Sequence, residues 1–257
     1  MSDYVQIERD GHILFLAINR PDKLNALDAQ MMDDLAQKCR EIERSDVRVV
    51  ILLGRGKAFS SGGDIAAWGA KTSTSFGRHW VRDGHLAFDA LSRLRQPLIA
   101  VLDGHALGGG LELAACADLR VAERQVKIGQ PETGIGIIPG WSGTQRAVRR
   151  FGAQSVRRMA VLGEVFSADE AFAQGIVDHV VATGEGLKKA TEIAISLLER
   201  GPRATELAKM LINAAEGEEA ERVVEALAGT IAAGSDELQE GLAAFAEKRK
   251  PNFRDKT

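Results

Sequence analysis

Hydrophobic and polar positions change their spacing along the chain in a way that predicts a hairpin and then a helix. Residues 4–20 contain two β-rich runs separated by Asp10 and Gly11, a dipeptide suited to a tight turn. From Ala29 to Ile42, apolar side chains recur with the three- and four-residue spacing of a helix. The chain is therefore expected to open with a β-hairpin followed by an amphipathic helix.

A continuous apolar run at 47–54 predicts a strand that is covered on both faces, and residues 97–104 predict a second buried strand. Two further strands are predicted at 118–123 and 176–181. Helices are predicted at 85–95 and from Gly108 onward. Another helix is predicted after Ser167, which can form a capping box with Glu170. Residues 64–84 have no clear period and are interpreted as a surface excursion.

Beyond about residue 186 the strands cease and the chain reads as helices. The helical segments lie around Leu197 and Leu198 and at 202–216, 219–233 and 236–248. This pattern predicts an α/β protein with a core at 1–195 and a helical region at 196–257. Alanine and leucine on the helix faces favour oligomerisation as the role of the second region.

Composition and charge narrow the class of protein. The chain is 45% hydrophobic and 27% charged, with a net charge of −3, which is typical of a soluble globular protein and favours neither nucleic acid nor a membrane as partner. Cys39 and Cys116 lie in apolar periodic segments and are expected to be buried thiols. The five histidines form no ligand cluster, so no metal is expected. Neither a signal peptide nor a membrane-spanning run is visible, which favours a cytoplasmic location.

Three glycine-containing stretches approach known motifs and fail their spacing. Residues 134–140 carry a proline where a dinucleotide fingerprint needs its third glycine. Residues 54–57 lack the glycine that a phosphate loop requires five residues before Gly56. Residues 140–143 do not continue into a nucleophile elbow. All three are interpreted as turns.

The candidate chemistry gathers in three glycine-containing loops that follow or adjoin β structure, at 58–65, 105–118 and 129–146. Glycines near a helix start expose N–H groups that have no partner within the helix, and two such groups from different loops can hold one oxygen as it gains negative charge. Glu112 and Glu132 could then reach atoms beside that oxygen. Each feature also has an ordinary explanation, since glycine makes turns and the helix dipole favours an acid in the first turn.

Five stretches in order along the chain, at 19–27, 54–65, 104–118, 129–146 and 245–253, resemble the enoyl-CoA hydratase/isomerase family, the crotonases. The resemblance implies a spiral of β-β-α units followed by a helical trimerisation region. It implies an acyl-coenzyme A thioester as substrate, a homo-oligomer that is either a trimer or a dimer of trimers, and no cofactor apart from the coenzyme A of the substrate.

The resemblance also assigns roles to particular residues. The backbone amides of Gly63 and Gly109 correspond to the oxyanion hole, and Glu112 and Glu132 to the acid–base pair of the hydratases. The residues that correspond to positions around the substrate and its coenzyme A are Lys23, Ala26, Ser61, Asp64, Ile65, Ala66, Gly108, Gly140 and Trp141. Phosphate contacts are expected from the basic C-terminus of a neighbouring subunit, at Lys248, Arg249 and Lys250.

Adding water to a conjugated thioester needs a base at Cβ and a proton donor at Cα, which two neighbouring carboxyl groups can supply. The sequence therefore predicts an enoyl-CoA hydratase, or the same reaction in reverse. The alternatives are a double-bond isomerase and a non-catalytic binding protein. The only tyrosine, Tyr4, lies in the predicted first strand, which disfavours branches of the family that need a tyrosine in the active site. Gly140 stands where several other branches resemble one another in placing an aspartate, which disfavours those branches as well.

Four further side chains are left with open interpretations. Trp141 either narrows the acyl pocket or packs away from it. Trp68 and Trp80 either line the exit of the acyl tail or pack in the core or at its rim. His105 is interpreted as a strand-end residue rather than as a catalytic base.

Overall fold

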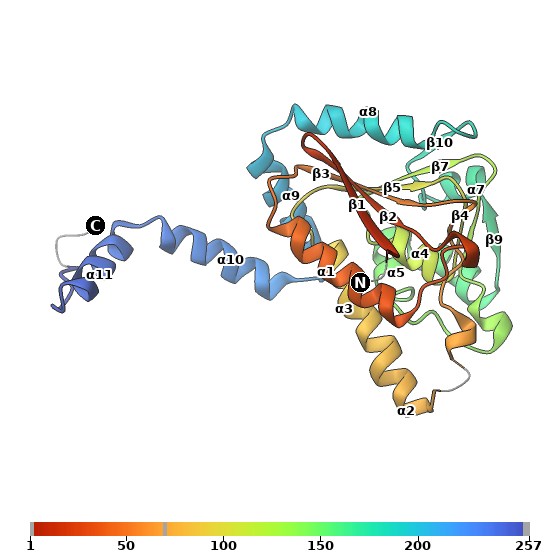
Figure 1. The fold of residues 1–257 in the computed structure, drawn as a ribbon, viewed down its shortest axis with the longest axis horizontal. Helices are drawn as coiled ribbons and strands as arrows, with labels where there is room; N and C mark the ends of the chain where they lie inside the picture. The colour runs from red at the N-terminus through yellow and green to blue at the C-terminus, as the bar shows by residue number, and fades with distance from the viewer. Residues whose placement is uncertain (1–2, 69–70, 254–257) are drawn as a thin grey trace. The chain divides into compact units, whose positions relative to one another are not determined.

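The computed structural model describes residues 3–68 and 71–253 (Figure 1). The chain divides into two compact units, 1–209 and 210–257. The first unit contains both β-sheets, and the second is helical. Each unit is described separately.

The first unit is built around a six-stranded sheet in the order β1-β2-β3-β5-β7-β10. Its strands are β1 (Val5–Asp10), β2 (Ile13–Ile18), β3 (Val49–Gly54), β5 (Leu98–Leu102), β7 (Leu119–Glu123) and β10 (His179–Val181). The strands β1 and β2 pair antiparallel, with Asp10 opposite Ile13, and all other neighbours are parallel. Gly11 adopts a φ of 57° in the turn, so the hairpin prediction is confirmed.

Both faces of this sheet are covered at β3 and β5, which explains why these two strands show no polar alternation. Helix α8 (Gly186–Leu198) contributes Ala190 and Ala194 to a cluster with residues of β3 such as Ile51. On the other face, Val50 and Leu52 belong to a larger cluster with α1 (Ala29–Glu43) and α3 (Arg82–Ser92).

A second, four-stranded sheet was not predicted from the sequence. Its order is β4-β6-β8-β9, and the strands are β4 (Ala58–Ser60), β6 (His105–Leu107), β8 (Lys127–Gly129) and β9 (Val165–Ser167). Each strand has only three residues, which is too short to produce a period in the sequence. Residues 58–60, which we expected to be loop, are therefore strand. His105 begins β6, as expected, and its Nδ1 accepts the N–H of Lys127 at 3.0 Å.

Short helices connect these strands. They are α4 (Gly109–Ala114), α5 (Arg146–Phe151), α6 (Ala153–Val156) and α7 (Ala168–Ala173), with 3₁₀ turns η1 (Pro21–Lys23), η2 (Ile65–Ala67) and η4 (Glu132–Ile135) and a π-helical turn η5 (Arg157–Val161). The capping box predicted at the start of α7 is present: the Ser167 hydroxyl accepts the Glu170 N–H, and the Glu170 carboxylate accepts the Ser167 N–H.

The described residues of the stretch 64–84 are mostly exposed or partly buried, which confirms the prediction of a surface excursion, but they form helical turns and bury Trp80. Apart from residues 69 and 70, which lie outside the described residues, the stretch forms η2, the short helix α2 (Ser73–Ser75), the π-helical turn η3 (Phe76–Val81) and the start of α3. Trp80 is buried in the core of the first unit. A π-helical turn does not have the regular three- to four-residue period of an α-helix, which explains why the apolar residues of this stretch predicted no helix.

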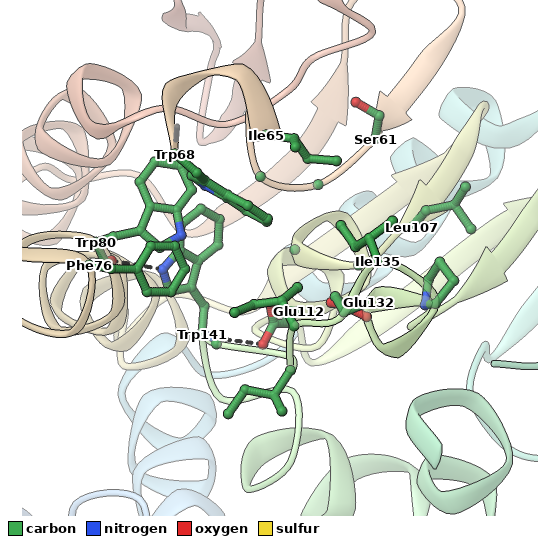
Figure 2. Close-up of a pocket in the computed structure, with 18 residues that line it drawn as sticks. Ser61, Ile65, Trp68, Phe76, Trp80, Leu107, Glu112, Glu132, Ile135 and Trp141 are labelled. Carbon is green, nitrogen blue, oxygen red and sulfur yellow. Dashed lines mark hydrogen bonds between the residues drawn. The ribbon is translucent and has the colours of Figure 1, made fainter. Parts of the chain in front are cut away.

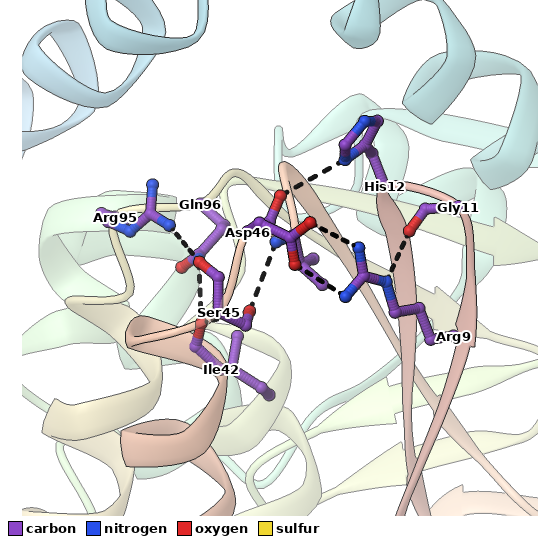
Figure 3. Close-up of polar contacts among 9 residues, drawn as sticks. Arg9, Gly11, His12, Ile42, Ser45, Asp46, Arg95 and Gln96 are labelled. Atoms are coloured by element: carbon purple, nitrogen blue, oxygen red, sulfur yellow. Dashed lines mark hydrogen bonds and ion pairs between the residues drawn. The ribbon is translucent and has the colours of Figure 1, made fainter.

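Polar contacts join the hairpin to the loop after α1 (Figure 3). The Arg9 guanidinium donates to both carboxylate oxygens of Asp46, at 2.7 and 2.8 Å. On the other side of this loop, Arg95 donates to the carbonyl of Ser45, and Gln96 donates to the carbonyl of Ile42. The pair between Arg9 and Asp46 is exposed, so it orients the loop and adds little to stability.

The second unit consists of helices. Helix α9 (Pro202–Ala215) extends into it, and α10 (Ala220–Ala233) and α11 (Asp236–Ala246) follow. Ile231 and Phe245 expose most of their surface. Arg249 is held by Glu240 at 2.6 Å and by Glu247 at 2.5 Å, so its guanidinium is engaged within this unit.

Three structural findings bear on the predictions from composition. Cys39 and Cys116 are both buried thiols, as expected. Over residues 3–68 and 71–253, no helix is long and apolar enough to span a membrane. In the same described ranges, histidine, cysteine and acidic side chains form no group of three or more that could hold a metal ion.

Candidate active site

A cavity of about 200 Å³ lies where the glycine-containing loops of the second sheet meet residues 65–68 and 76–80 (Figure 2). It is lined by Ser61, Gly62, Gly63, Ile65, Trp68, Phe76, Trp80, Leu107, Gly108, Gly109, Glu112, Pro131, Glu132, Ile135, Ile137, Ile138, Gly140 and Trp141. All three loops singled out in the sequence therefore contribute to one cavity.

Two backbone amides at this cavity lie close together. Gly63 follows β4, and Gly109 is the first residue of α4. A Cβ atom added to Gly109 would lie 3.3 Å from the amide nitrogen of Gly63, and one added to Gly62 would lie 3.0 Å from the amide nitrogen of Gly109. Glycine is therefore needed for the two loops to approach. Among the described residues, neither the Gly63 nor the Gly109 N–H has a hydrogen-bond acceptor.

The sharp turn before α4 also depends on glycine. Gly108 adopts a φ of 53° and a ψ of −125°, a conformation that side chains with a Cβ rarely adopt. A Cβ at this position would lie 3.0 Å from Oε1 of Glu132. Gly108 therefore gives α4 its orientation and leaves space for a carboxylate.

Glu112 is buried in the first turn of α4, and the loop at 141–143 holds its side chain. Oε1 accepts the N–H of Trp141 at 2.7 Å and the N–H of Gly143 at 2.6 Å. Burial and, to a smaller degree, the charge of Glu132 raise the pKa of Glu112 to about 8, although the two N–H groups and Arg146 act in the opposite direction. The loop thus fixes the carboxyl group while its surroundings favour the protonated form.

Glu132 reaches the same cavity from η4, which follows β8. Neither of its carboxylate oxygens has a hydrogen-bond partner among the described residues, and both are buried. Burial raises the pKa of Glu132 above its ordinary value. In Figure 2, Glu112 and Glu132 lie near one another at the cavity, as their electrostatic coupling requires. The structure therefore brings the two acids together.

Four aromatic rings form one wall of the cavity. Trp68, Phe76 and Trp80 lie within 6.3 Å of one another, centroid to centroid, and Trp80 lies 4.9 Å from Trp141. The Trp141 indole N–H donates to the carbonyl of Trp80 at 3.0 Å. Trp141 is packed among aromatic rings and also lines the cavity, so the interpretation that it packs away from the pocket is wrong, while its effect on the acyl group stays a prediction. Trp68 and Trp80 likewise line the cavity while packing against the core.

The other predicted substrate contacts fall into two groups. Ser61, Ile65, Gly108 and Gly140 line the cavity, whereas Lys23, Ala26, Asp64 and Ala66 lie outside its lining. Lys23 and Ala66 are exposed, and Ala26 and Asp64 are partly buried. The Arg20 side chain joins the last two, because it donates to the carbonyl of Ala26 at 3.0 Å and to the carboxylate of Asp64 at 2.9 Å.

Sequence reasoning missed the residues that support Glu112. Gly143 donates to Glu112, and the side-chain amide of Gln130 donates to the Gly143 carbonyl at 3.0 Å. A Cβ on Gly143 would lie 2.5 Å from Oε1 of Glu112. Phe76 was also missed as part of the wall. The only signal in the sequence was the density of glycines at 134–143, which we interpreted as turns.

Comparison with known proteins places this geometry in a family. A sequence model described as enoyl-CoA hydratase/isomerase matches residues 8–256. The chain is 36% identical over 251 residues to the crotonyl-CoA hydratase of Syntrophomonas wolfei, with 96% of each chain covered. It is 36% identical over 250 residues to the short-chain-enoyl-CoA hydratase of Clostridium acetobutylicum, covering 96% of this chain and 95% of the other.

Solved structures agree with the sequence match. The crystal structure of an enoyl-CoA hydratase from Bacillus anthracis superimposes with a TM-score of 0.79 at 32% identity, covering 97% of this chain and 98% of the other. The predicted crotonase-like α/β fold is therefore confirmed, while the trimerisation role of the C-terminal helices stays a prediction.

Proposed function

The chain belongs to the enoyl-CoA hydratase/isomerase family, and on that premise we propose that it adds water across the 2,3 double bond of an enoyl-CoA thioester, or catalyses the reverse dehydration. The observation that carries the proposal is the convergence of Glu112 and Glu132 on one cavity that also presents the amides of Gly63 and Gly109. These groups match the requirements of the reaction.

In the proposed reaction the thioester oxygen accepts hydrogen bonds from the N–H groups of Gly63 and Gly109. A carboxylate removes a proton from water, the water oxygen bonds to Cβ, and the electrons of the double bond move toward the thioester oxygen. The two amides stabilise the resulting enolate, and a carboxylic acid then delivers a proton to Cα. One water is consumed, and the carboxyl pair ends with the same number of protons.

The electrostatics of the pair suit this cycle. Burial raises the pKa of both carboxyl groups, and the charge of Glu132 further raises that of Glu112. Two neighbouring buried carboxyl groups cannot both ionise without strong repulsion, so near neutral pH the pair is expected to share one proton. One group then serves as base while the other serves as acid.

The test measures loss of the conjugated thioester absorbance when crotonyl-CoA is mixed with the protein. We expect hydration by the wild type and its loss in a Glu112→Gln, Glu132→Gln double variant, since amides can neither accept nor release the proton. A 3-enoyl-CoA substrate tests the isomerase alternative, because its conversion would create that absorbance. Absence of hydration at every chain length would refute the proposal, and full activity in the double variant would refute the role of the acids.

We further propose that the helical region of the chain mediates homo-oligomerisation and that Lys23 and Ala26 contact the coenzyme A. Exposed apolar side chains on α10 and α11, including Ile231 and Phe245, support the first part. The exposed side chain of Lys23 supports the second, because it is available to a phosphate. Arg249 is already paired with two glutamates, which favours Lys248 and Lys250 over Arg249 as phosphate contacts.

A further inference from the structure

We propose that Trp141 limits the length of the acyl group, so that this protein acts on short-chain enoyl thioesters. The inference rests on the proposed function, because it concerns the acyl side of the same cavity. The inference follows from the way the indole ring of Trp141 is packed. Neither the oxyanion hole nor the pair of acids needs a tryptophan side chain at this position.

The first observation is that indole rings press on both glycines of the proposed oxyanion hole. A Cβ on Gly109 would lie 2.9 Å from Cζ3 of Trp141. A Cβ on Gly63 would lie 2.9 Å from Trp68 and 3.0 Å from Trp80. The space next to the thioester carbonyl is therefore occupied by rings in contact with the backbone that would bind it.

The second observation is that Trp141 joins two walls of the cavity. One wall comes from residues 65–68 and 76–80, and the other comes from residues 135–141. The Trp141 indole N–H donates to the carbonyl of Trp80 at 3.0 Å, and the two rings lie 4.9 Å apart. A longer acyl chain that left the cavity between these segments would have to break this hydrogen bond and separate the rings.

The third observation is that the ring has no room to turn aside. The Trp141 side chain is packed on Gly84 of α3, where an added Cβ would lie 2.0 Å from the indole nitrogen. The ring centroid of Phe88 lies 5.3 Å from that of Trp141. Trp141 is 2% exposed and Trp80 is 4% exposed. Close-packed rings do not shift without cost, so the wall acts as a fixed stop rather than as a flexible lid.

The position of the indole wall sets the expected selectivity, because the rings of Trp68, Trp80 and Trp141 lie directly beside the glycines that would bind the thioester carbonyl. Each methylene that does not fit is expected to lower kcat/KM by about 10- to 200-fold. In the proposed pose the acyl chain runs toward the rings beside Gly63 and Gly109, so an eight-carbon group meets the indole wall before a four-carbon group does.

The experiment compares hydration of crotonyl-CoA and 2-octenoyl-CoA by the wild type and by Trp141→Leu and Trp141→Phe. The leucine variant opens space, and the phenylalanine variant keeps a ring but lacks the N–H. Both keep the backbone N–H that holds Glu112. The matched control is Phe166→Leu, which shortens a buried aromatic side chain of the same core cluster on β9 that does not line the cavity.

We expect the wild type to prefer the four-carbon substrate by at least about 100-fold in kcat/KM, and Trp141→Leu to reduce this ratio at least about tenfold by accelerating the longer substrate. Trp141→Phe should give an intermediate ratio, and Phe166→Leu should preserve the wild-type ratio. Equal rates on both chain lengths in the wild type, or a ratio that Trp141→Leu leaves unchanged, would overturn the inference.

A binding measurement separates this inference from the proposed function. Butyryl-CoA and octanoyl-CoA have no double bond and cannot be hydrated, so calorimetry reports the length limit without catalysis. Tighter binding of butyryl-CoA by the wild type, relieved in Trp141→Leu, would uphold the limit even if no hydration occurred. Hydration of crotonyl-CoA together with equal binding of the two thioesters would uphold the function and refute the limit.

Discussion

Replacing Gly143 with alanine should impair catalysis although neither proposed catalytic acid is substituted. The added Cβ would lie 2.5 Å from Oε1 of Glu112, 2.3 Å from Nε2 of Gln130 and 2.6 Å from Cβ of Pro139. All of these distances are shorter than a methyl group tolerates, so the loop or the carboxyl group must move. Either movement breaks the hydrogen bond from the Gly143 N–H to Glu112, which is 2.6 Å long in the native arrangement.

The size of the effect follows from that bond. A hydrogen bond to a charged group contributes about 1.5–3 kcal/mol. Since about 1.4 kcal/mol corresponds to a tenfold change in rate, kcat/KM should fall by roughly 10- to 150-fold if the bond matters only in the transition state. Loss of an N–H donor also removes an interaction that lowers the pKa of Glu112, so this pKa should rise further above about 8.

The assay is steady-state hydration of crotonyl-CoA between pH 6 and pH 10. Gly134→Ala serves as the matched control, because Gly134 belongs to the neighbouring turn η4 and a Cβ there would meet nothing within 4 Å. We expect this control to retain wild-type kinetics. Gly143→Ala with activity within twofold of the wild type, or with a loss equal to that of Gly134→Ala, would refute the reasoning.

Three further outcomes are expected. Gly109→Ala should lower kcat for crotonyl-CoA by about 10²–10³-fold, because its Cβ would meet Trp141 at 2.9 Å and displace the proposed oxyanion amide; near-normal kcat would contradict this. The kcat of the wild type should fall as pH rises past about 8, where Glu112 loses its proton, and a rate that climbs steadily to pH 10 would count against a shared proton. Folding raises the pKa of Glu112 from 4.5 to about 8, so between these two pH values the folded state binds more protons than the unfolded state. The free energy of unfolding should therefore decline as pH rises from 4.5 to about 8. Thermal unfolding of Glu112→Gln should lack this part of the decline, and the same pH dependence in variant and wild type would refute the raised pKa.

The elements that could be predicted from the sequence are those with long patterns or strong local chemistry. The hairpin follows from its turn at Gly11, and the helix after Ser167 follows from its capping box, since both signals lie within a few residues. The second sheet could not be predicted, because β4, β6, β8 and β9 have three residues each and their partners lie far apart along the chain.

The candidate site shows the same division. Glu112 and Glu132 stand out beside glycine-rich stretches, and the structure brings them together at one cavity. Their support could not be foreseen, because the contacts from Trp141 and Gly143 to Glu112 span 29 and 31 residues. Ser142, between these two donors, adopts a φ of 77°, and no residue-type preference identifies it as such a position.

The contact between Trp141 and Gly84 has an evolutionary consequence. Any side chain larger than hydrogen at 84 would overlap the indole, so a descendant can acquire bulk at 84 only after it has given up tryptophan at 141. Along a lineage, a substitution at 141 should therefore precede any substitution at 84. Designers who transplant the 135–141 loop into another scaffold must transfer the helical glycine with it.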